Sequence, residues 1–190
     1  KNLHFHVIIV NMESKAENRK KILQMLKNFS DYEKRRQNKD VLKQLTASSK
    51  WKSAKKIALY MSMPIEFNLT ELFDQSDDKE ILIPKCLPER QMIFAKYDKE
   101  NLVRSKFGLL EPKSEIAVEP DFILVPGLIW NDEGYRIGFG GGYYDRYLAN
   151  FEGSTASVLY DFQKMDFEAE SHDIAVQELF IAVSYTHLTL

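Results

Sequence analysis

A glycine-rich stretch in the second half of the chain is the segment best suited to do chemistry. It reads Arg136-Ile-Gly-Phe-Gly-Gly-Gly-Tyr-Tyr-Asp145, with four glycines between residues 138 and 142. Glycines let backbone N–H groups turn towards an anion, and a following helix start adds partial positive charge. Arg136 supplies a cation suited to phosphate oxygens, and Asp145 supplies a hard oxygen ligand suited to Mg²⁺. These residues predict a phosphate-binding loop with a metal ligand at its end.

Two common nucleotide motifs do not match this stretch. The dinucleotide fingerprint requires a third glycine where this chain has Tyr143, and no Gly-Lys-Ser/Thr ending marks a Walker loop. A tight turn without a ligand remains the alternative interpretation, because glycine clusters often serve only turns.

Length and composition indicate one globular domain. Of 190 residues, 44% are hydrophobic and 28% are charged, which suits a folded protein with a sizeable core. Cys86 is the single cysteine; we expect it to be a buried small hydrophobe in a reducing compartment. The apolar run Val7–Val10 is far shorter than the roughly 20 residues of a membrane span, and it lacks the features of a secretory signal. We therefore expect a cytoplasmic protein without a membrane partner.

Positive charge is concentrated in the first third of the chain. Residues 1–60 carry 15 Lys and Arg against 5 Asp and Glu, although the net charge of the whole chain is −2. Such a segment suits a nucleic acid, an acidic membrane surface, a polyanionic small ligand or an ordinary solvated helix face. The basic residues fall on two predicted helices without interleaved exposed aromatics, which argues against a nucleic-acid partner.

The elements that must position these residues follow from capping signals and apolar runs. Ser14 and Ser30 each stand three residues before a glutamate, the spacing of a capping box, and predict two helices. The first carries the apolar stripe Ile22, Leu23, Met25, Leu26 and Phe29, and the second spans about 31–45. Further helices are predicted over 68–73 and 144–151, and strands over 57–61, 81–84, 91–97, 122–125, 157–160 and 180–183. This alternation predicts an α/β fold, a three-layer α/β/α arrangement with a mostly parallel, Rossmann-like central sheet and ligands at the carboxyl ends of its strands.

The chain resembles the 5-formyltetrahydrofolate cyclo-ligase family over about residues 13–182. The resemblance rests on five blocks in the family's order: Ala58–Glu66, Phe107–Pro112, Val125–Trp130, Gly134–Arg146 and Glu170–Asp173. It implies a single domain over 13–183, which leaves 1–12 and 184–190 as extensions of uncertain origin.

The resemblance implies a function. Family members use ATP to cyclise 5-formyltetrahydrofolate to 5,10-methenyltetrahydrofolate, releasing ADP and phosphate through a phosphorylated formyl intermediate. The implied cofactor is Mg²⁺, the implied co-substrate is ATP, and we expect a monomer. A folate- or nucleotide-binding regulatory protein without catalysis remains the alternative, since fold alone does not fix function.

The resemblance also implies roles for individual residues. Those matching the nucleotide site are Lys15, Arg19, Arg136, Ile137, Gly138, Phe139, Gly140, Gly141, Gly142, Tyr143 and Tyr144. Those matching the folate site are Met61, Glu66, Phe139, Gly140, Gly141, Gly142 and Tyr143. Asp145 and Asp173 match Mg²⁺ ligands, and Arg136, Tyr143 and Asp145 are the candidate catalytic residues. His172 is expected to be structural.

At two positions the residue differs from the one that most or some family members carry. Asn18 stands where leucine is usual, so the polar side chain is expected to weaken the packing of the first helix. Position 141 is lysine in some members and Gly141 here, which makes the remaining cations more important for binding phosphate.

Trp130 and Tyr160 are candidate aromatic walls of the site, although such residues more often belong to the hydrophobic core.

Overall fold

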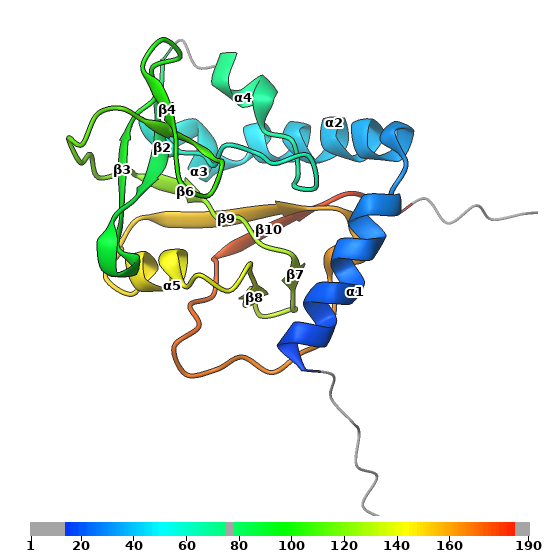
Figure 1. Ribbon diagram of the computed structural model, residues 1–190. Helices are drawn as coiled ribbons and strands as arrows, with labels where there is room; N and C mark the ends of the chain where they lie inside the picture. The colour runs from blue at the N-terminus through cyan, green and yellow to red at the C-terminus, as the bar shows by residue number, and fades with distance from the viewer. Residues whose placement is uncertain (1–13, 75–77, 185–190) are drawn as a thin grey trace, which may run out of the picture.

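The computed structural model describes residues 14–74 and 78–184 and contains one six-stranded sheet at its centre (Figure 1). The strand order is β10-β9-β6-β1-β2-β3. Their bounds are β1 Lys56–Ala58, β2 Glu80–Cys86, β3 Met92–Lys96, β6 Phe122–Leu124, β9 Ser154–Leu159 and β10 Glu178–Ile181. All neighbours pair in parallel except β2 and β3. The predicted mostly parallel sheet is confirmed, with β3 as the antiparallel edge strand.

Helices cover both faces of the sheet. Figure 1 shows α2, α3 and α4 on one side of the sheet, α5 on the other, and α1 crossing beside one end of the strands. The bounds are α1 Lys15–Asn28, α2 Asp31–Ala47, α3 Ser49–Ser53, α4 Thr70–Asp74 and α5 Tyr143–Leu148. The three-layer prediction is therefore also confirmed.

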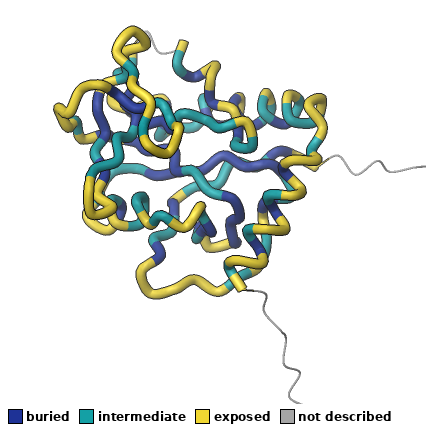
Figure 2. The backbone as a smooth tube through the Cα atoms, viewed as in Figure 1, coloured by how far each residue is buried: buried dark blue, intermediate teal, exposed yellow. Residues whose placement is uncertain are grey.

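The sheet separates two hydrophobic cores because successive side chains of a strand point to opposite faces. On β1 and just beyond it, Ile57 and Leu59 pack into the core beneath α1 and α2, whereas Ala58 packs into the core beside α5. On β6, Phe122 and Ile123 divide in the same way. Figure 2 shows these strands as the buried centre, with exposed positions on the outer helix surfaces and loops.

The helix starts follow the predicted caps, with one difference. At α1, Glu17 N–H donates to Ser14 Oγ at 3.2 Å and Ser14 N–H donates to the Glu17 carboxylate at 2.8 Å, which completes a capping box. At α2, Ser30 Oγ accepts from Glu33 N–H, but the Glu33 carboxylate pairs with Arg36 at 2.7 Å. At α2, therefore, only the serine side chain caps the helix, and the capping box is incomplete.

Several sequence expectations differ from the structure. Met25, predicted on the apolar stripe of α1, is 43% exposed. Cys86, predicted as a buried hydrophobe, is only half-buried and lines a cavity. The elements not predicted are α3 and the hairpin strands β4 Leu102–Arg104, β5 Leu110–Pro112, β7 Ile129–Trp130 and β8 Arg136–Ile137. These strands are two or three residues long, which is too short to show periodicity.

The two predicted extensions lie outside the described residues, except for Ser184, whose hydroxyl donates to Asp161 at 3.4 Å. Within the described ranges, no helix is long and apolar enough to cross a membrane.

The turn between β7 and β8 depends on Gly134, which has φ of +88°. Its carbonyl accepts a hydrogen bond from Val176 N–H at 2.9 Å, which ties the turn to the segment before β10. A Cβ at Gly134 would collide with the Val176 carbonyl oxygen, whereas a Cβ at Gly108, with φ of +78°, would meet nothing within 4 Å.

We predict that Gly134→Ala lowers the free energy of unfolding by about 2–4 kcal/mol and Gly108→Ala by only about 1 kcal/mol. Both variants carry the strain of a positive φ, so their difference isolates the backbone collision. Urea unfolding followed by circular dichroism measures both values. Equal losses in the two variants would contradict the prediction.

Candidate active site

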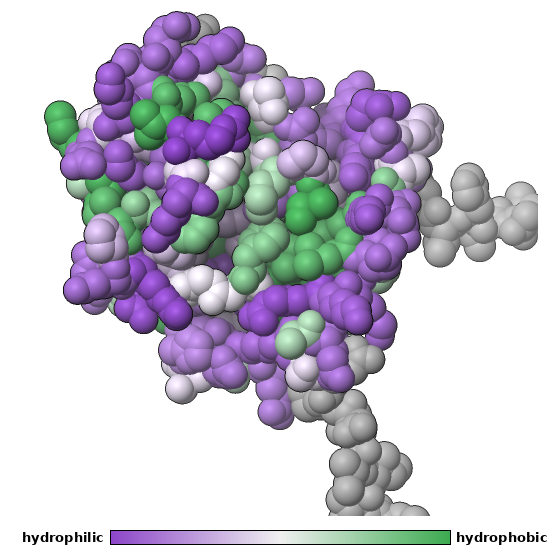
Figure 3. Space-filling model, viewed as in Figure 1, coloured by the Kyte–Doolittle hydropathy of each residue, from purple (hydrophilic) through white to green (hydrophobic). Residues whose placement is uncertain are grey.

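One cavity of about 490 Å³ opens at the carboxyl ends of the central strands. Its walls come from α1, the segment after β1, the β2–β3 and β4–β5 hairpins, the glycine-rich stretch, the start of α5 and the segment before β10. Figure 3 shows hydrophobic surface gathered on this face beside α1, bordered by hydrophilic residues.

The structure brings together all the residues that the resemblance matched to the nucleotide, folate and metal sites. The cavity is lined by Lys15, Arg19, Met61, Glu66, Arg136, Ile137, Gly138, Phe139, Gly140, Gly141, Gly142, Tyr143, Tyr144, Asp145 and Asp173. Residues that are far apart in the sequence thus line one cavity. This is expected for a parallel sheet, because ligands bind beyond the carboxyl ends of its strands.

The glycine-rich stretch follows β8 and enters α5, and the helix after the glycines is as predicted. Gly140 and Gly142 have φ of +97° and +72°, which favours glycine at both positions. Arg19 Nε donates to the Gly138 carbonyl at 2.7 Å, and its guanidinium approaches Gly140. The loop is therefore held from α1.

Arg136 is committed to the protein's own groups. Its side chain is only 4% exposed, and its guanidinium contacts Asp145 Oδ1 at 3.2 Å and donates to the Ile174 carbonyl at 3.0 Å. Asp145 Oδ1 also accepts from Ile174 N–H at 3.1 Å. Arg136 thus holds α5 and the segment before β10 in place, which leaves little of it for a phosphate.

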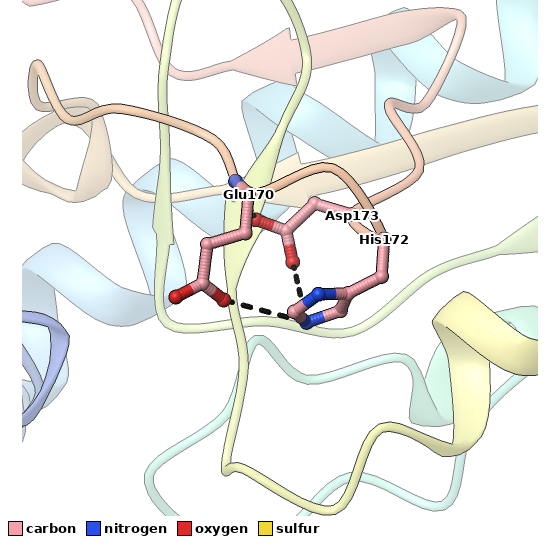
Figure 4. A group of neighbouring side chains, drawn as sticks. All are labelled: Glu170, His172 and Asp173. Atoms are coloured by element: carbon pink, nitrogen blue, oxygen red, sulfur yellow. Dashed lines mark hydrogen bonds and ion pairs between the residues drawn. The ribbon is translucent and has the colours of Figure 1, made fainter.

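Lys15 lies against an acidic group at the edge of the cavity. Its Nζ is 2.8 Å from both Glu170 Oε2 and Asp173 Oδ2. Figure 4 shows Glu170, His172 and Asp173 turned towards one another, with His172 Nε2 3.3 Å from Glu170 and 3.6 Å from Asp173. Partial burial is the largest single influence on both Lys15 and Asp173 and opposes their charges, but the hydrogen bonds and neighbouring charges together outweigh it, raising the pKa of Lys15 and lowering the pKa of Asp173.

The far side of the cavity carries the partly buried carboxylate of Glu66. Burial raises the pKa of Glu66 to about 7, against the opposing hydrogen bond that its Oε2 accepts from Met63 N–H at 2.8 Å. The Tyr144 hydroxyl is also buried, and it has no hydrogen-bond partner among residues 14–74 and 78–184. This end therefore holds polar groups whose hydrogen-bonding capacity is not used within the protein.

The donor chemistry fits a hard cation. Asp145 Oδ1 is taken by Arg136 and Ile174, and Asp145 Oδ2 has no partner within the described ranges. A free carboxylate oxygen in a polar cavity suits Mg²⁺. Asp173 lies in a group with Glu170 and His172 whose ligand atoms are within 4.8 Å of one another.

Sequence reasoning missed several lining residues. Glu170 and Phe107 stood in the matched blocks but received no role. Phe107 is 55% exposed, and its ring lies 6.5 Å from that of Tyr143 in an edge-to-face arrangement. Exposed aromatics beside a cavity are the signal that would have identified it. The further lining residues without an assigned role are Tyr60, Met63, Pro84, Cys86, Met92, Leu109, Leu110, Glu111, Pro126 and His172.

Two further candidate residues lie in the hydrophobic cores. Trp130 and Tyr160 are 1% and 2% exposed, so the core interpretation holds for both. Asn18 is buried within α1, and the weaker packing expected there stays a prediction.

Comparisons with known proteins agree with this geometry. The model of the 5-formyltetrahydrofolate cyclo-ligase family matches residues 11–181. A probable 5-formyltetrahydrofolate cyclo-ligase of Schizosaccharomyces pombe is 32% identical over 61% of this chain, and the match spans 62% of that protein's length. The 5-formyltetrahydrofolate cyclo-ligase of Mycoplasma pneumoniae is 31% identical over 82% of this chain and 91% of its own length.

Two solved structures share the fold. The 5,10-methenyltetrahydrofolate synthetase of Aquifex aeolicus has a TM-score of 0.78 and 33% identity, covering 93% of this chain and 99% of its own. That of Mycoplasma pneumoniae has a TM-score of 0.71 and 26% identity, covering 88% and 98%. These similarities support a 5,10-methenyltetrahydrofolate synthetase activity. With a matched family model across residues 11–181, the chain belongs to the 5-formyltetrahydrofolate cyclo-ligase family of enzymes.

Proposed function

We propose that this protein cyclises 5-formyltetrahydrofolate to 5,10-methenyltetrahydrofolate with ATP and Mg²⁺, releasing ADP and phosphate. The observation that carries the proposal is one shared cavity, lined by Lys15 and Arg19 of α1, the glycine-rich stretch, two aspartates and the partly buried Glu66. A nucleotide, a cation and a folate each have matching chemistry within reach of the others.

The proposed reaction has two steps. The formyl oxygen attacks the terminal phosphorus of ATP, so that a new O–P bond forms as the bond to ADP breaks. A neighbouring folate nitrogen then attacks the activated carbon and loses its proton, and the C–O bond to phosphate breaks. Because no covalent enzyme nucleophile is needed, the protein's task is to position the reactants and stabilise charge.

The nucleotide end of the cavity meets these needs through α1 and the glycine-rich stretch. Lys15 and Arg19 supply cations one helical turn apart, and backbone N–H groups between Gly138 and Gly142 supply uncharged donors. Asp145 and Asp173 would hold Mg²⁺, which neutralises charge on the transferred phosphoryl group. Arg136 keeps Asp145 oriented, and Tyr143 forms the wall between the two substrates.

The folate end depends on Glu66. Met63 N–H occupies Glu66 Oε2, which leaves Oε1 to accept from the paired donor edge of an aminopyrimidinone ring. Met61 adds an apolar contact beside it. The single cysteine fits a cytoplasmic compartment, and we propose that the protein acts as a monomer.

Turnover is tested with purified protein, ATP, Mg²⁺ and 5-formyltetrahydrofolate, followed by the near-ultraviolet absorbance of the methenyl product. We predict that Asp145→Asn lowers the rate by about 100-fold or more, because both a metal ligand and the partner of Arg136 are lost. Circular dichroism at the assay temperature checks that the variant is folded.

The matched control is Asp166→Asn, an exposed aspartate that should keep full activity. Full activity in Asp145→Asn would remove the metal role of this residue. Tight folate binding by the wild type without turnover at micromolar enzyme would instead favour a binding protein.

Glu66 gives a prediction that depends on pH. Its folded pKa of about 7 lies above the 4.5 expected in the unfolded chain, so the folded state holds the proton more tightly between these values. The contribution of Glu66 to stability is therefore greatest below pH 4.5 and declines as pH rises to 7. The loss is at most about 3 kcal/mol.

We predict that Glu66→Gln unfolds at higher urea than the wild type at pH 8 but not at pH 4.5, and that it binds 5-formyltetrahydrofolate at least about tenfold more weakly. Urea titrations and calorimetry measure the two effects. Glu71→Gln, at an exposed position of α4, is the control and should match the wild type. Unchanged folate affinity in Glu66→Gln would refute the substrate role.

A further inference from the structure

The two cations of α1 that line the cavity, Lys15 and Arg19, have partners within the protein. Lys15 Nζ lies 2.8 Å from carboxylate oxygens of both Glu170 and Asp173, and Arg19 donates to the Gly138 carbonyl. Lys15 is the first residue of α1, and its side chain remains 24% exposed. Its ammonium therefore lies at the cavity edge with room to move.

One oxygen of Asp173 is fully engaged in this arrangement, and the other faces an imidazole. Its Oδ2 accepts from both Lys15 and Glu170 N–H, each at 2.8 Å, and its Oδ1 faces His172. The Asp173 side chain is only 6% exposed, so water cannot readily replace these partners. A divalent cation on Asp173 and the ammonium of Lys15 on the same oxygen would repel each other strongly.

This conflict has a simple physical resolution. The lysine side chain is a long flexible stem that ends in a point charge, and it can exchange one anionic partner for another. Nucleotide phosphates entering the cavity would offer such a partner. Movement of Lys15 to the phosphates would release Asp173 and Glu170 at the moment when a cation is required.

We propose that Lys15 is a stand-in for the metal: it neutralises Asp173 and Glu170 in the nucleotide-free protein and yields them to a divalent cation when nucleotide binds. The proposal rests on the proposed function, which makes Asp173 a metal ligand. It adds that metal and nucleotide bind with positive coupling, and that each tightens the binding of the other by the same factor.

The experiment uses Mn²⁺, whose free concentration is followed by electron paramagnetic resonance, with and without ADP. We predict that Lys15→Met binds Mn²⁺ without ADP at least about tenfold more tightly than the wild type. The tightening of Mn²⁺ binding caused by ADP should shrink in the variant. Lys15→Gln is the second variant should Lys15→Met fail to fold, as judged by circular dichroism.

Two control variants test whether the gain in Mn²⁺ affinity comes from releasing Asp173. Lys20→Met removes an exposed lysine of the same helix and should bind Mn²⁺ as the wild type does. Adding Asp173→Asn to Lys15→Met should abolish the gain in affinity. A gain that persists without Asp173 would overturn the proposal, because the cation would then be bound elsewhere.

The remaining outcomes distinguish a wrong role for Lys15 from a wrong metal assignment. If ADP strengthens Mn²⁺ binding equally in the wild type and Lys15→Met, and their affinities without ADP agree, the metal site stands and the stand-in role is wrong. If neither protein binds Mn²⁺ even with ADP, the metal assignment of the proposed function fails, and the role of Lys15 fails with it.

Discussion

The buried guanidinium of Arg136 is the contact on which the rest of the site depends. It joins Asp145 of α5 to the Ile174 carbonyl before β10, and it stands directly ahead of the glycine-rich stretch. A buried charge without partners costs several kcal/mol, so the three segments are constrained to meet around it. The positions of Asp145, the loop and the neighbouring Asp173 therefore follow from one set of hydrogen bonds.

The same constraint shapes the charge distribution of the cavity. Arg136 is paired with Asp145, Lys15 is paired with Asp173 and Glu170, and Arg19 is bound to a backbone carbonyl. Asp145, Asp173 and Glu170 thus equal these three cations in number, and the cavity lining also includes Glu66 and Glu111. Ligand binding must exchange some of these internal partners, and the partly exposed side chains of α1 are better placed to do so than Arg136.

Much of the fold could be predicted from sequence, because short apolar runs mark buried parallel strands and serines mark the starts of α1 and α2. The site residues that line the candidate cavity were also predictable, most of them because they lie in the blocks that resemble the family. Their partners were not. Lys15 and Asp173 meet only after the sheet has been assembled in the order β10-β9-β6-β1, and periodicity carries no information on such distant contacts. For the same reason, Arg136 was expected to bind phosphate rather than to hold Asp145.

The glycine at position 141 gains a physical explanation from this arrangement. A Cβ there would lie 2.9 Å from the Tyr143 ring, so any side chain at this position would have to displace that ring. The loop therefore keeps Tyr143 in the cavity wall and forgoes the lysine that some family members carry. Because Arg136 is buried and already paired, the proposed function leaves neutralisation of the phosphates to Lys15, Arg19 and the proposed Mg²⁺. Under that proposal Lys15 and Arg19 have to exchange their present partners, which requires the first turn of α1 to be mobile.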